Sequence, residues 1–327
     1  MQYPKVSILM ACYNGSRFIS RSFESILAQT WPNIELVFVD DGSTDDSKDV
    51  AMKYSERFAR KGFELKILSQ QNQGFCAAAA NAAKIATGKY LQILDVDDFI
   101  MPESCRLQAE FLERHDEINV VRTNGFVVHE EHPEIKQPLE RNAKSYIHRN
   151  IFMDLIAGTI NNWAGAYMVR ADKHKYFYST HTFPISRYGQ NLQFLLPQTI
   201  DAPSGFIDLP LFKYYRYIGS HSNQASYEKQ MENLNGYWDI RRTMLKLLGV
   251  NDSDILAVCE KAYLKRAIAI AYDFKMENDY RQFYSKLKNL KGLTLELKIQ
   301  DSIHNGSLVQ YWYRICLKFK KLLKNND

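Results

Sequence analysis

Three clusters of polar and charged residues stand where chemistry could occur, each directly after a short apolar segment. They are Ala11-Cys12-Tyr13-Asn14-Gly15, Asp40-Asp41-Gly42-Ser43-Thr44-Asp45 and Asp95-Val96-Asp97-Asp98. The last cluster places three carboxylates within four residues, and these repel one another unless a cation or hydrogen-bond donors lie among them. Such a cluster suits a divalent ion held by one or two carboxylates together with phosphate oxygens of a ligand. Tyr13 offers a flat face to a nucleotide base, and a buried aspartate could accept from a base imide N–H.

Taken singly, each cluster has an ordinary structural explanation as a turn, a helix cap or a solvated acidic loop. A functional site is favoured because the strands and helices predicted around the clusters would place all three clusters at one edge of a sheet. Short apolar segments that read as buried strands alternate with helix patterns, one of which opens on a capping box of Ser43 and Asp46. The predicted strands are 5–12, 34–39, 63–68 and 90–94, and the helices are 16–29, a segment from 43, and 76–87. This order predicts a parallel sheet with helices on both faces, and ligands bind at the carboxyl ends of such strands.

The composition is that of a globular protein with ample material for a core. Of 327 residues, 46% are hydrophobic and 24% charged, and 42 Lys and Arg against 37 Asp and Glu give a net charge of +5. Disordered, collagen-like and disulfide-scaffold classes are excluded on these numbers. The five scattered cysteines predict free thiols in a reducing compartment. We expect a cytoplasmic protein, because no signal peptide follows Met1 and no segment approaches the roughly 18 apolar residues of a membrane span.

Two common nucleotide-binding motifs are missing, which counts against some classes of nucleotide-binding protein. The first strand is not followed by GxGxxG, and GxxxxGK[ST] does not occur, which removes the main support for dinucleotide-binding and P-loop proteins. The ordered set VSILMACYN, IELVFVDDGSTD, NQG and ATGKYLQILDVDD, followed by Met101-Pro102, resembles glycosyltransferase family 2. The resemblance is strong over residues 4–115 and weaker to about 225. It implies an inverting, metal-dependent enzyme of the GT-A fold, a Rossmann-like and mainly parallel α/β sheet flanked by helices, that uses a nucleotide-activated sugar.

The resemblance also implies roles for single residues. Ala11, Tyr13 and Asp41, with Asn14 beside them, would hold the nucleotide. Asp95 would face the ribose or sugar, and Asp97 would bind Mn²⁺ or Mg²⁺. Asp95 and His221 would be further metal ligands, and Asp98 would shape the loop or bind the metal. Trp163 and Tyr167 would contact the acceptor. For His221, a diphosphate contact and plain exposure to solvent stay open as alternatives. For Trp163, the alternative is a place in the core.

Two departures from the family pattern stand out. The helix after the NQG turn reads Gly74-Phe75-Cys76-Ala77-Ala78-Ala79-Ala80-Asn81 and lacks the arginine that the family often places near the donor. The usual Gly-Glu-Asp of the acceptor loop is replaced by Gly189-Gln190-Asn191, a variant pattern that continues into Leu195-Leu196-Pro197. The amide side chains of Gln190 and Asn191 cannot take a proton near pH 7, so neither could act as a general base that activates the acceptor hydroxyl. Three explanations stay open: Asp98, His181 or His221 is the base, the acceptor is acidic enough to need little help, or the protein binds without turnover.

The chain is predicted to have two parts. Residues 1–225 would form the glycosyltransferase domain, with a nucleotide-sugar half to about 130 and an acceptor half from about 131. Residues 226–327 would be helical, with helices at 227–248, 254–275 and near 279–290. The final segment, 309–327, carries five basic residues against one acid and has an amphipathic helix pattern. It predicts either peripheral contact with an anionic membrane on its cytoplasmic face or docking on the protein itself.

The sequence therefore favours transfer of a sugar, with a UDP-sugar expected as donor, to a hydroxyl of a glycan or lipid-linked acceptor in bacterial surface polysaccharide synthesis, such as lipopolysaccharide or capsule. No nucleic-acid partner is expected. A nucleotidyltransferase would need a Gly-rich, Lys-bearing loop after the first strand, which residues 11–15 do not provide. The more serious alternative is a non-catalytic nucleotide-sugar-binding or assembly protein, because of Gln190 and Asn191.

Overall fold

A computed structural model describes residues 3–139, 149–160, 162–217, 226–295 and 297. The chain divides into two compact units, residues 1–259 and 260–327. The strands of the described residues lie in the first unit, where they form one nine-stranded sheet. The functional division into 1–225 and 226–327 stays a prediction.

The first part of the sheet is parallel, as predicted. Its elements are β1 (Val6–Cys12), α1 (Ser16–Leu27), β2 (Ile34–Asp40), α2 (Ser47–Met52), α3 (Ser55–Lys61), β3 (Glu64–Ser69), α4 (Phe75–Ile85) and β4 (Tyr90–Ile93). β1 pairs in parallel with both β2 and β4, and β2 pairs in parallel with β3. The predicted capping box is wrong: α2 begins at Ser47, and the Ser43 hydroxyl accepts instead from the backbone N–H of Asn14.

The second part of the sheet mixes directions, which the sequence did not predict. Its elements are β5 (Phe99–Ile100), α5 (Ser104–Arg114), β6 (Val120–His129), β7 (His132–Pro138), α6 (Phe152–Ala157), β8 (Tyr167–Arg170), α7 (Ala171–Thr180), α8 (Gln190–Thr199) and β9 (Ser204–Arg216). The strand order is β3-β2-β1-β4-β8-β6-β9-β5, with β7 on β6. β8 runs antiparallel to both β4 and β6, whereas β6 and β9 are parallel. The α/β class is confirmed: β1–β4 form a wholly parallel region, and β6 and β9 form a second parallel pair beyond the antiparallel β8.

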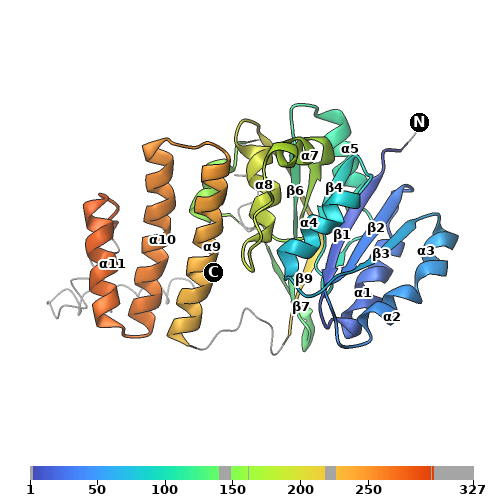
Figure 1. The fold of residues 1–327 in the computed structure, drawn as a ribbon, viewed down its shortest axis with the longest axis horizontal. Coiled ribbons are helices and arrows are strands. Elements are labelled where there is room, and N and C mark those ends of the chain that lie inside the picture. The colour runs from blue at the N-terminus through green and yellow to red at the C-terminus, as the bar shows by residue number, and fades with distance from the viewer. Residues whose placement is uncertain (1–2, 140–148, 161, 218–225, 296, 298–327) are drawn as a thin grey trace, which may run out of the picture. The chain divides into compact units, whose positions relative to one another are not determined.

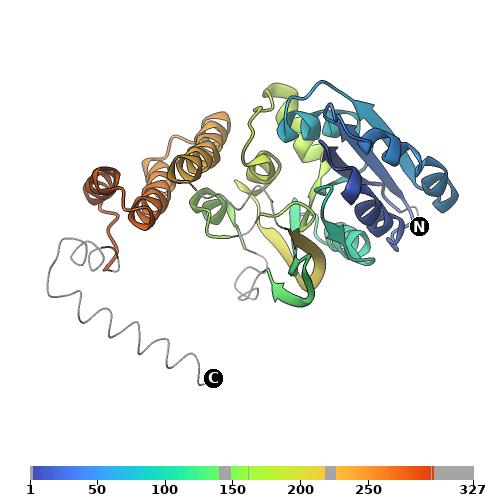
Figure 2. The same ribbon diagram turned by 90° about the horizontal axis from the view of Figure 1, so that it is seen from below.

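Helices cover both faces of the parallel region (Figures 1 and 2). Alternate side chains of β1 and β2 pack with Phe23 and Ile26 of α1 in one hydrophobic core, because successive side chains of a strand point to opposite faces. α4 crosses back over the opposite face, as a right-handed connection from β3 to β4 requires. Its buried face is almost entirely alanine, which lets the helix approach the sheet closely.

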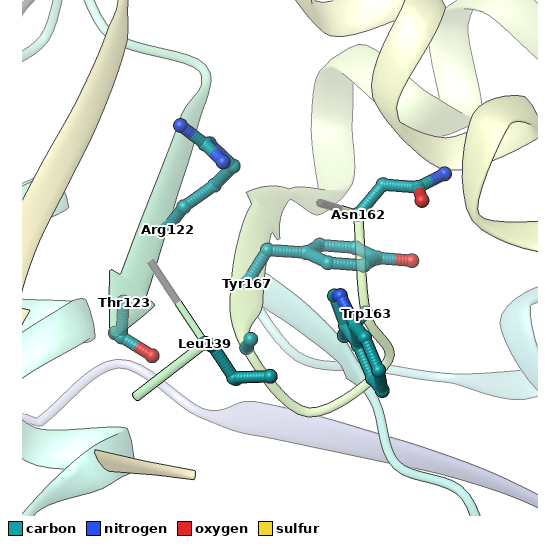
Figure 3. Close-up of a pocket in the computed structure, with 7 residues that line it drawn as sticks. Arg122, Thr123, Leu139, Asn162, Trp163 and Tyr167 are labelled. Carbon is teal, nitrogen blue, oxygen red and sulfur yellow. The ribbon is translucent and has the colours of Figure 1, made fainter. Parts of the chain in front are cut away.

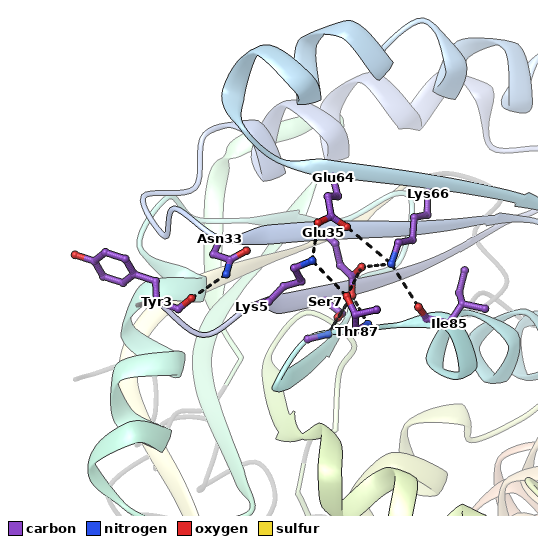
Figure 4. A network of polar contacts seen from close by, with 10 residues as sticks. Tyr3, Lys5, Ser7, Asn33, Glu35, Glu64, Lys66, Ile85 and Thr87 are labelled. Carbon is purple, nitrogen blue, oxygen red and sulfur yellow. Dashed lines mark hydrogen bonds and ion pairs between the residues drawn. The ribbon is translucent and has the colours of Figure 1, made fainter. Parts of the chain in front are cut away.

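The amino edge of the parallel strands is held by a buried carboxylate, that of Glu35 on β2 (Figure 4). It accepts hydrogen bonds from Ser7 of β1, from Lys66 of β3, and from Thr87 and Gly88 just before β4. Burial alone would raise the pKa of Glu35, but these donors outweigh it and lower the pKa below its usual value. The edge opposite the predicted site is therefore fixed by satisfied polar contacts.

The predicted C-terminal helices are confirmed as α9 (Tyr227–Leu247), α10 (Ser253–Asp273) and α11 (Glu277–Asn289). Ser226 caps α9 by accepting from the backbone N–H of Lys229. None of the helices described here has the length and apolar character needed to cross a bilayer. The basic segment 309–327 lies outside the described residues, so its membrane contact stays a prediction.

Candidate functional site

The loops after β1 and β2 are tied together at the carboxyl edge of the sheet. The backbone N–H of Asn14 donates to the Ser43 hydroxyl at 3.0 Å, and the Asn14 amide oxygen accepts from the N–H of Thr44 at 2.8 Å. Asn14 has a φ of 51°, a left-handed conformation that asparagine tolerates better than most residues. Asn14 is predicted to contact the donor; in the structure it holds together the two loops that would surround the donor.

The residues predicted to hold the nucleotide base differ in how far they are exposed to solvent. Tyr13 is 52% exposed, whereas Ala11 and Asp41 are buried. The Asp41 carboxylate accepts from the Gln70 side-chain amide at 2.7 Å and from the backbone N–H groups of Gln73 and Gly74 at 2.9 and 2.8 Å. A carboxylate has about four lone-pair positions. A base imide would therefore share an oxygen that already fixes the loop leading into α4.

The acidic cluster follows β4 at the same edge, and its three carboxylates have different surroundings. Asp98 is buried, and its Oδ1 accepts from the backbone N–H of Tyr215 at 3.0 Å. The Asp97 carboxylate accepts from the Tyr217 hydroxyl. The Oδ1 atom of Asp95 is buried and has no hydrogen-bond partner among the described residues. Asp98 thus ties the loop to β9, while Asp95 keeps acceptor capacity that the protein leaves unused. Whether Asp98 shapes the loop or binds the cation stays a prediction.

Crowding and burial disfavour the charged forms of these carboxylates. Burial, reinforced by the charge of Asp97, raises the pKa of Asp95 to about 7. Burial also raises the pKa of Asp97, although Tyr217, Arg21 and Arg17 act against the rise. For Asp98, burial and its two acidic neighbours raise the pKa well above the usual value. A divalent cation would reverse this effect, since it favours the ionised form of every carboxylate near it.

The donor set fits a hard divalent cation. Carboxylate oxygens are the ligands that Mg²⁺ and Mn²⁺ prefer, and a buried oxygen without a partner is available on Asp95. Among the described residues, no group of three His, Cys, Asp or Glu side chains is arranged around a common point. His221, the third expected ligand, lies outside the described residues.

Two arginines of α1 were not identified from the sequence. The guanidinium carbon of Arg21 lies 3.8 Å from the ring centroid of Tyr215, and its Nη2 donates to the Asp97 carbonyl at 2.6 Å. That of Arg17 lies 4.9 Å from the ring centroid of Tyr217. The two arginines are four residues apart on the helix that follows the first cluster, so the sequence could have indicated that they share one face of it. They bring positive charge to the acidic loop.

Asn191 is placed by a buried tyrosine. It is the second residue of α8, and its Oδ1 accepts from the Tyr167 hydroxyl at 2.8 Å. Burial raises the pKa of Tyr167 well above its usual value, and the charge of Asp95 adds to the rise. The same tyrosine therefore contacts Asn191 and lies within electrostatic reach of the acidic cluster. With Oδ1 accepting, the Asn191 NH₂ group remains to donate.

Trp163 and Tyr167 lie beside each other around a small cavity, with Asn162 above them (Figure 3). The cavity measures about 10 Å³, which is room for about one water molecule and not for a sugar ring. Trp163 is half-buried, with its ring centroid 4.1 Å from that of Tyr214. It therefore packs at the border of the core, and its role as a sugar platform stays a prediction.

Of the remaining candidates for the catalytic base, His181 lies apart from this group, and His221 lies outside the described residues. His181 stacks on Phe177 at 4.4 Å, at the carboxyl end of α7, and lines a different cavity. Gln190 is half-buried at the first position of α8. Of the alternatives that the sequence left open, only Asp98 belongs to the acidic loop among the described residues.

The chain is similar in sequence to known glycosyltransferases. The family model described as glycosyl transferase family 2 matches residues 7–177. EpsE of Bacillus subtilis, named as a glycosyltransferase, is 36% identical over 129 residues, which is 39% of this chain and 45% of that protein. The chain aligns with less than half of the length of this and the other first curated relatives.

Solved structures of similar fold cover most of the chain. Residues 1–349 of TarS from S. aureus, in complex with UDP-GlcNAc, match with a TM-score of 0.58 at 18% identity, covering 87% of this chain and 92% of that one. The mannosyltransferase PcManGT of Pyrobaculum calidifontis, in complex with GDP-Man and Mn²⁺, matches with a TM-score of 0.51 at 15% identity, covering 89% and 86%. The sheet with its flanking helices is thus a GT-A fold. With its matching family model spanning residues 7–177, the chain belongs to glycosyltransferase family 2.

Proposed function

We propose that this protein transfers a sugar, with inversion, from a nucleotide-sugar donor to a hydroxyl group, with a divalent cation bound at Asp97 and Asp95. The observation that carries the proposal is the acidic loop after β4, where three buried or half-buried carboxylates have raised pKa values and the Asp95 Oδ1 atom has no partner among the described residues. Such an arrangement costs stability by itself and is expected where a cation binds.

The chain's own residues would orient the donor. Tyr13 is exposed beside the buried Asp41 and could stack on the base. Arg17 and Arg21 would add positive charge next to the leaving diphosphate. The cation, when bound, would supply Lewis-acid neutralisation of the charge that builds on that diphosphate.

The Tyr167–Asn191 contact bears on how the acceptor is used. Because Asn191 is a neutral amide whose oxygen is engaged, it would orient the acceptor hydroxyl by donating to it and would not remove its proton. General-base help is typically worth about 10²–10⁴-fold, so turnover should be slow unless Asp98 or the acceptor itself makes up the difference.

A UDP-sugar is our proposed donor and a glycan or lipid-linked acceptor our proposed second substrate, in bacterial surface polysaccharide synthesis. The TarS structure holds UDP-GlcNAc and the PcManGT structure holds GDP-Man with Mn²⁺, which supports both the donor class and the cation. Contact of residues 309–327 with an anionic membrane would bring the enzyme to a lipid-linked acceptor.

The test is a thermal-unfolding panel of UDP-, GDP- and CDP-sugars, each with Mn²⁺ or with a chelator. A donor at about 100 times its dissociation constant should add about 2.7 kcal/mol of stability. We expect a metal-dependent shift with one nucleotide class, its loss in Asp97→Asn, and its retention in Asp201→Asn, an exposed aspartate outside the acidic loop. Donor hydrolysis with the nucleotide that binds then separates an enzyme from the non-catalytic alternative. Metal-dependent binding without hydrolysis or transfer would favour the latter.

A further inference from the structure

A groove of about 700 Å³ lies between α4, α7 and residues 181–185. Its size is within the range of small-molecule sites, about 300–1,000 Å³. None of the described residues that line it belongs to the acidic loop or to the Tyr13–Asp41 pair. Its lining residues are therefore distinct from those proposed to hold the donor and the cation.

The floor of the groove is apolar because α4 contributes only short side chains there. Ala77, Ala80 and Ala83 of α4 line it, together with Tyr178 and Phe183. Longer side chains at the three alanine positions would fill part of the groove. Such a floor suits an aliphatic or flat aromatic body.

A buried histidine adds unused polar capacity to this floor. His174 lines the groove and is only 4% exposed, with its ring stacked on Phe194 at a centroid distance of 4.4 Å. Its Nδ1 atom has no hydrogen-bond partner among the described residues. Burial and the neighbouring Lys175 lower the pKa of His174 to about 3, so the ring is neutral near pH 7 and adds no charge.

The rim of the groove is cationic. Lys84 and Lys175 line it and are exposed, whereas no Asp or Glu is found among its described lining residues. Lys84 Nζ donates to the Asn81 amide oxygen at 3.3 Å and Lys175 Nζ to the Ala86 carbonyl at 2.8 Å. Both partners are neutral, and neither lysine forms an ion pair within the described part of the chain.

We propose that this groove binds a small organic anion, whose apolar body lies on the alanine and aromatic floor and whose phosphate or carboxylate group lies at Lys84 and Lys175. The ammonium groups provide the charge that selects an anion. Ser179, Thr180 and Asn81 add hydrogen-bonding groups along the same groove. The ligand would also reach Gln73, whose backbone N–H holds Asp41, so the groove extends to the loop beneath the proposed nucleotide site.

The proposal is tested by calorimetric titration of the full chain with decyl phosphate, inorganic phosphate and decyltrimethylammonium, each below its micelle concentration. We expect saturable one-to-one binding of decyl phosphate, at least about 100-fold weaker binding of inorganic phosphate, and no binding of the cation. Lys84→Glu/Lys175→Glu should weaken decyl phosphate at least about tenfold, since two attractive contacts become repulsive. The matched control Lys48→Glu/Lys53→Glu reverses two exposed charges on α2 and just after it and should leave the affinity unchanged.

Ala80→Leu fills the floor and should weaken binding at least about tenfold, with circular dichroism confirming the fold. Should that variant fail to fold, the charge-reversal pair still decides the question. Equal binding of the cationic and anionic amphiphiles, or an unchanged affinity in Lys84→Glu/Lys175→Glu, would overturn the proposal. Binding only to vesicles that carry phosphatidic acid, with none to soluble decyl phosphate, would also overturn it. These readouts do not depend on sugar transfer, so they can fail while the proposed function holds, and the reverse.

Discussion

Removing the Glu35 carboxylate should loosen the amino edge of β1, β2, β3 and β4 without touching the carboxyl edge where the proposed site lies. Glu35 is 0% exposed, and one of its oxygens accepts from Ser7, Thr87 N–H and Gly88 N–H. The other accepts from Lys66 and from the Thr87 hydroxyl. Glu35 therefore joins three strands and the residues before the fourth through a single side chain.

The cost of each substitution follows from which donors lose their acceptor. Glu35→Ala leaves the buried Ser7 hydroxyl and the Thr87 N–H without an acceptor, whereas the Gly88 N–H keeps the Ser7 Oγ as acceptor at 2.8 Å. The loss should cost about 3–5 kcal/mol. Glu35→Gln retains one carbonyl oxygen for the Ser7, Thr87 and Gly88 donors and loses mainly the contact with Lys66. Lys66 is 31% exposed and can turn to water, so we expect a cost of about 1–2 kcal/mol. Glu56→Gln, on an exposed ion pair of α3 with Arg60, is the matched control and should cost under about 0.5 kcal/mol.

Urea unfolding followed by tryptophan fluorescence measures these differences, since Trp31 belongs to the core beside β2. The pH dependence of the unfolding free energy is a second test. Because the pKa of Glu35 is lowered in the folded protein, its stabilisation is present above the unfolded value of about 4.3 and is lost as the pH falls through the folded pKa. Glu35→Gln should remove that part of the acid sensitivity. A cost below about 1 kcal/mol for Glu35→Ala, or equal costs for the alanine and glutamine variants, would refute the reasoning.

Further predictions concern the proposed site. Because the pKa of Asp95 is raised to about 7, from about 3.9 in the unfolded chain, the metal-free chain should lose stability as the pH rises from about 4 to about 7, with no further loss from this group above that. Thermal unfolding of Asp95→Asn should show a flatter profile, and an unchanged one would contradict the effect. Asn191→Asp keeps an acceptor for the Tyr167 hydroxyl and adds a carboxylate, so initial rates of transfer should rise about tenfold or more; unchanged rates would show that another group already serves as base. Tyr167→Phe should cost about 1 kcal/mol of stability. If the tyrosine acts through Asn191, adding Tyr167→Phe to Asn191→Ala should cost little more.

Local patterns in the sequence were sufficient for the parallel part of the fold. The apolar segments of β1, β2, β3 and β4 are short, and turn or cap residues bound them, so their type and order could be predicted. Parallel strands end at one edge, which is why the clusters at Asp41 and Asp95 could be predicted to lie together. The same ordered motifs carried the family resemblance that the family model confirms.

The mixed part of the sheet could not be predicted in this way. β8 (Tyr167–Arg170) lies between β4 and β6 and is antiparallel to both. Its four residues give too little periodicity to identify a strand or its direction. The direction depends on pairing between segments some 50 to 80 residues apart, which no local pattern records.

The sequence by itself determined which residues carry charge at the strand ends, and the tertiary structure decided what each of them can do there. Asp41 and Asp95 are the same residue type in similar loops, yet one carboxylate is held by three donors and the other keeps a buried oxygen with no partner among the described residues. Asn191 depends on Tyr167, a residue 24 positions away. Burial and hydrogen bonding set the charge state of a carboxylate, and both arise from segments that meet only when the chain folds.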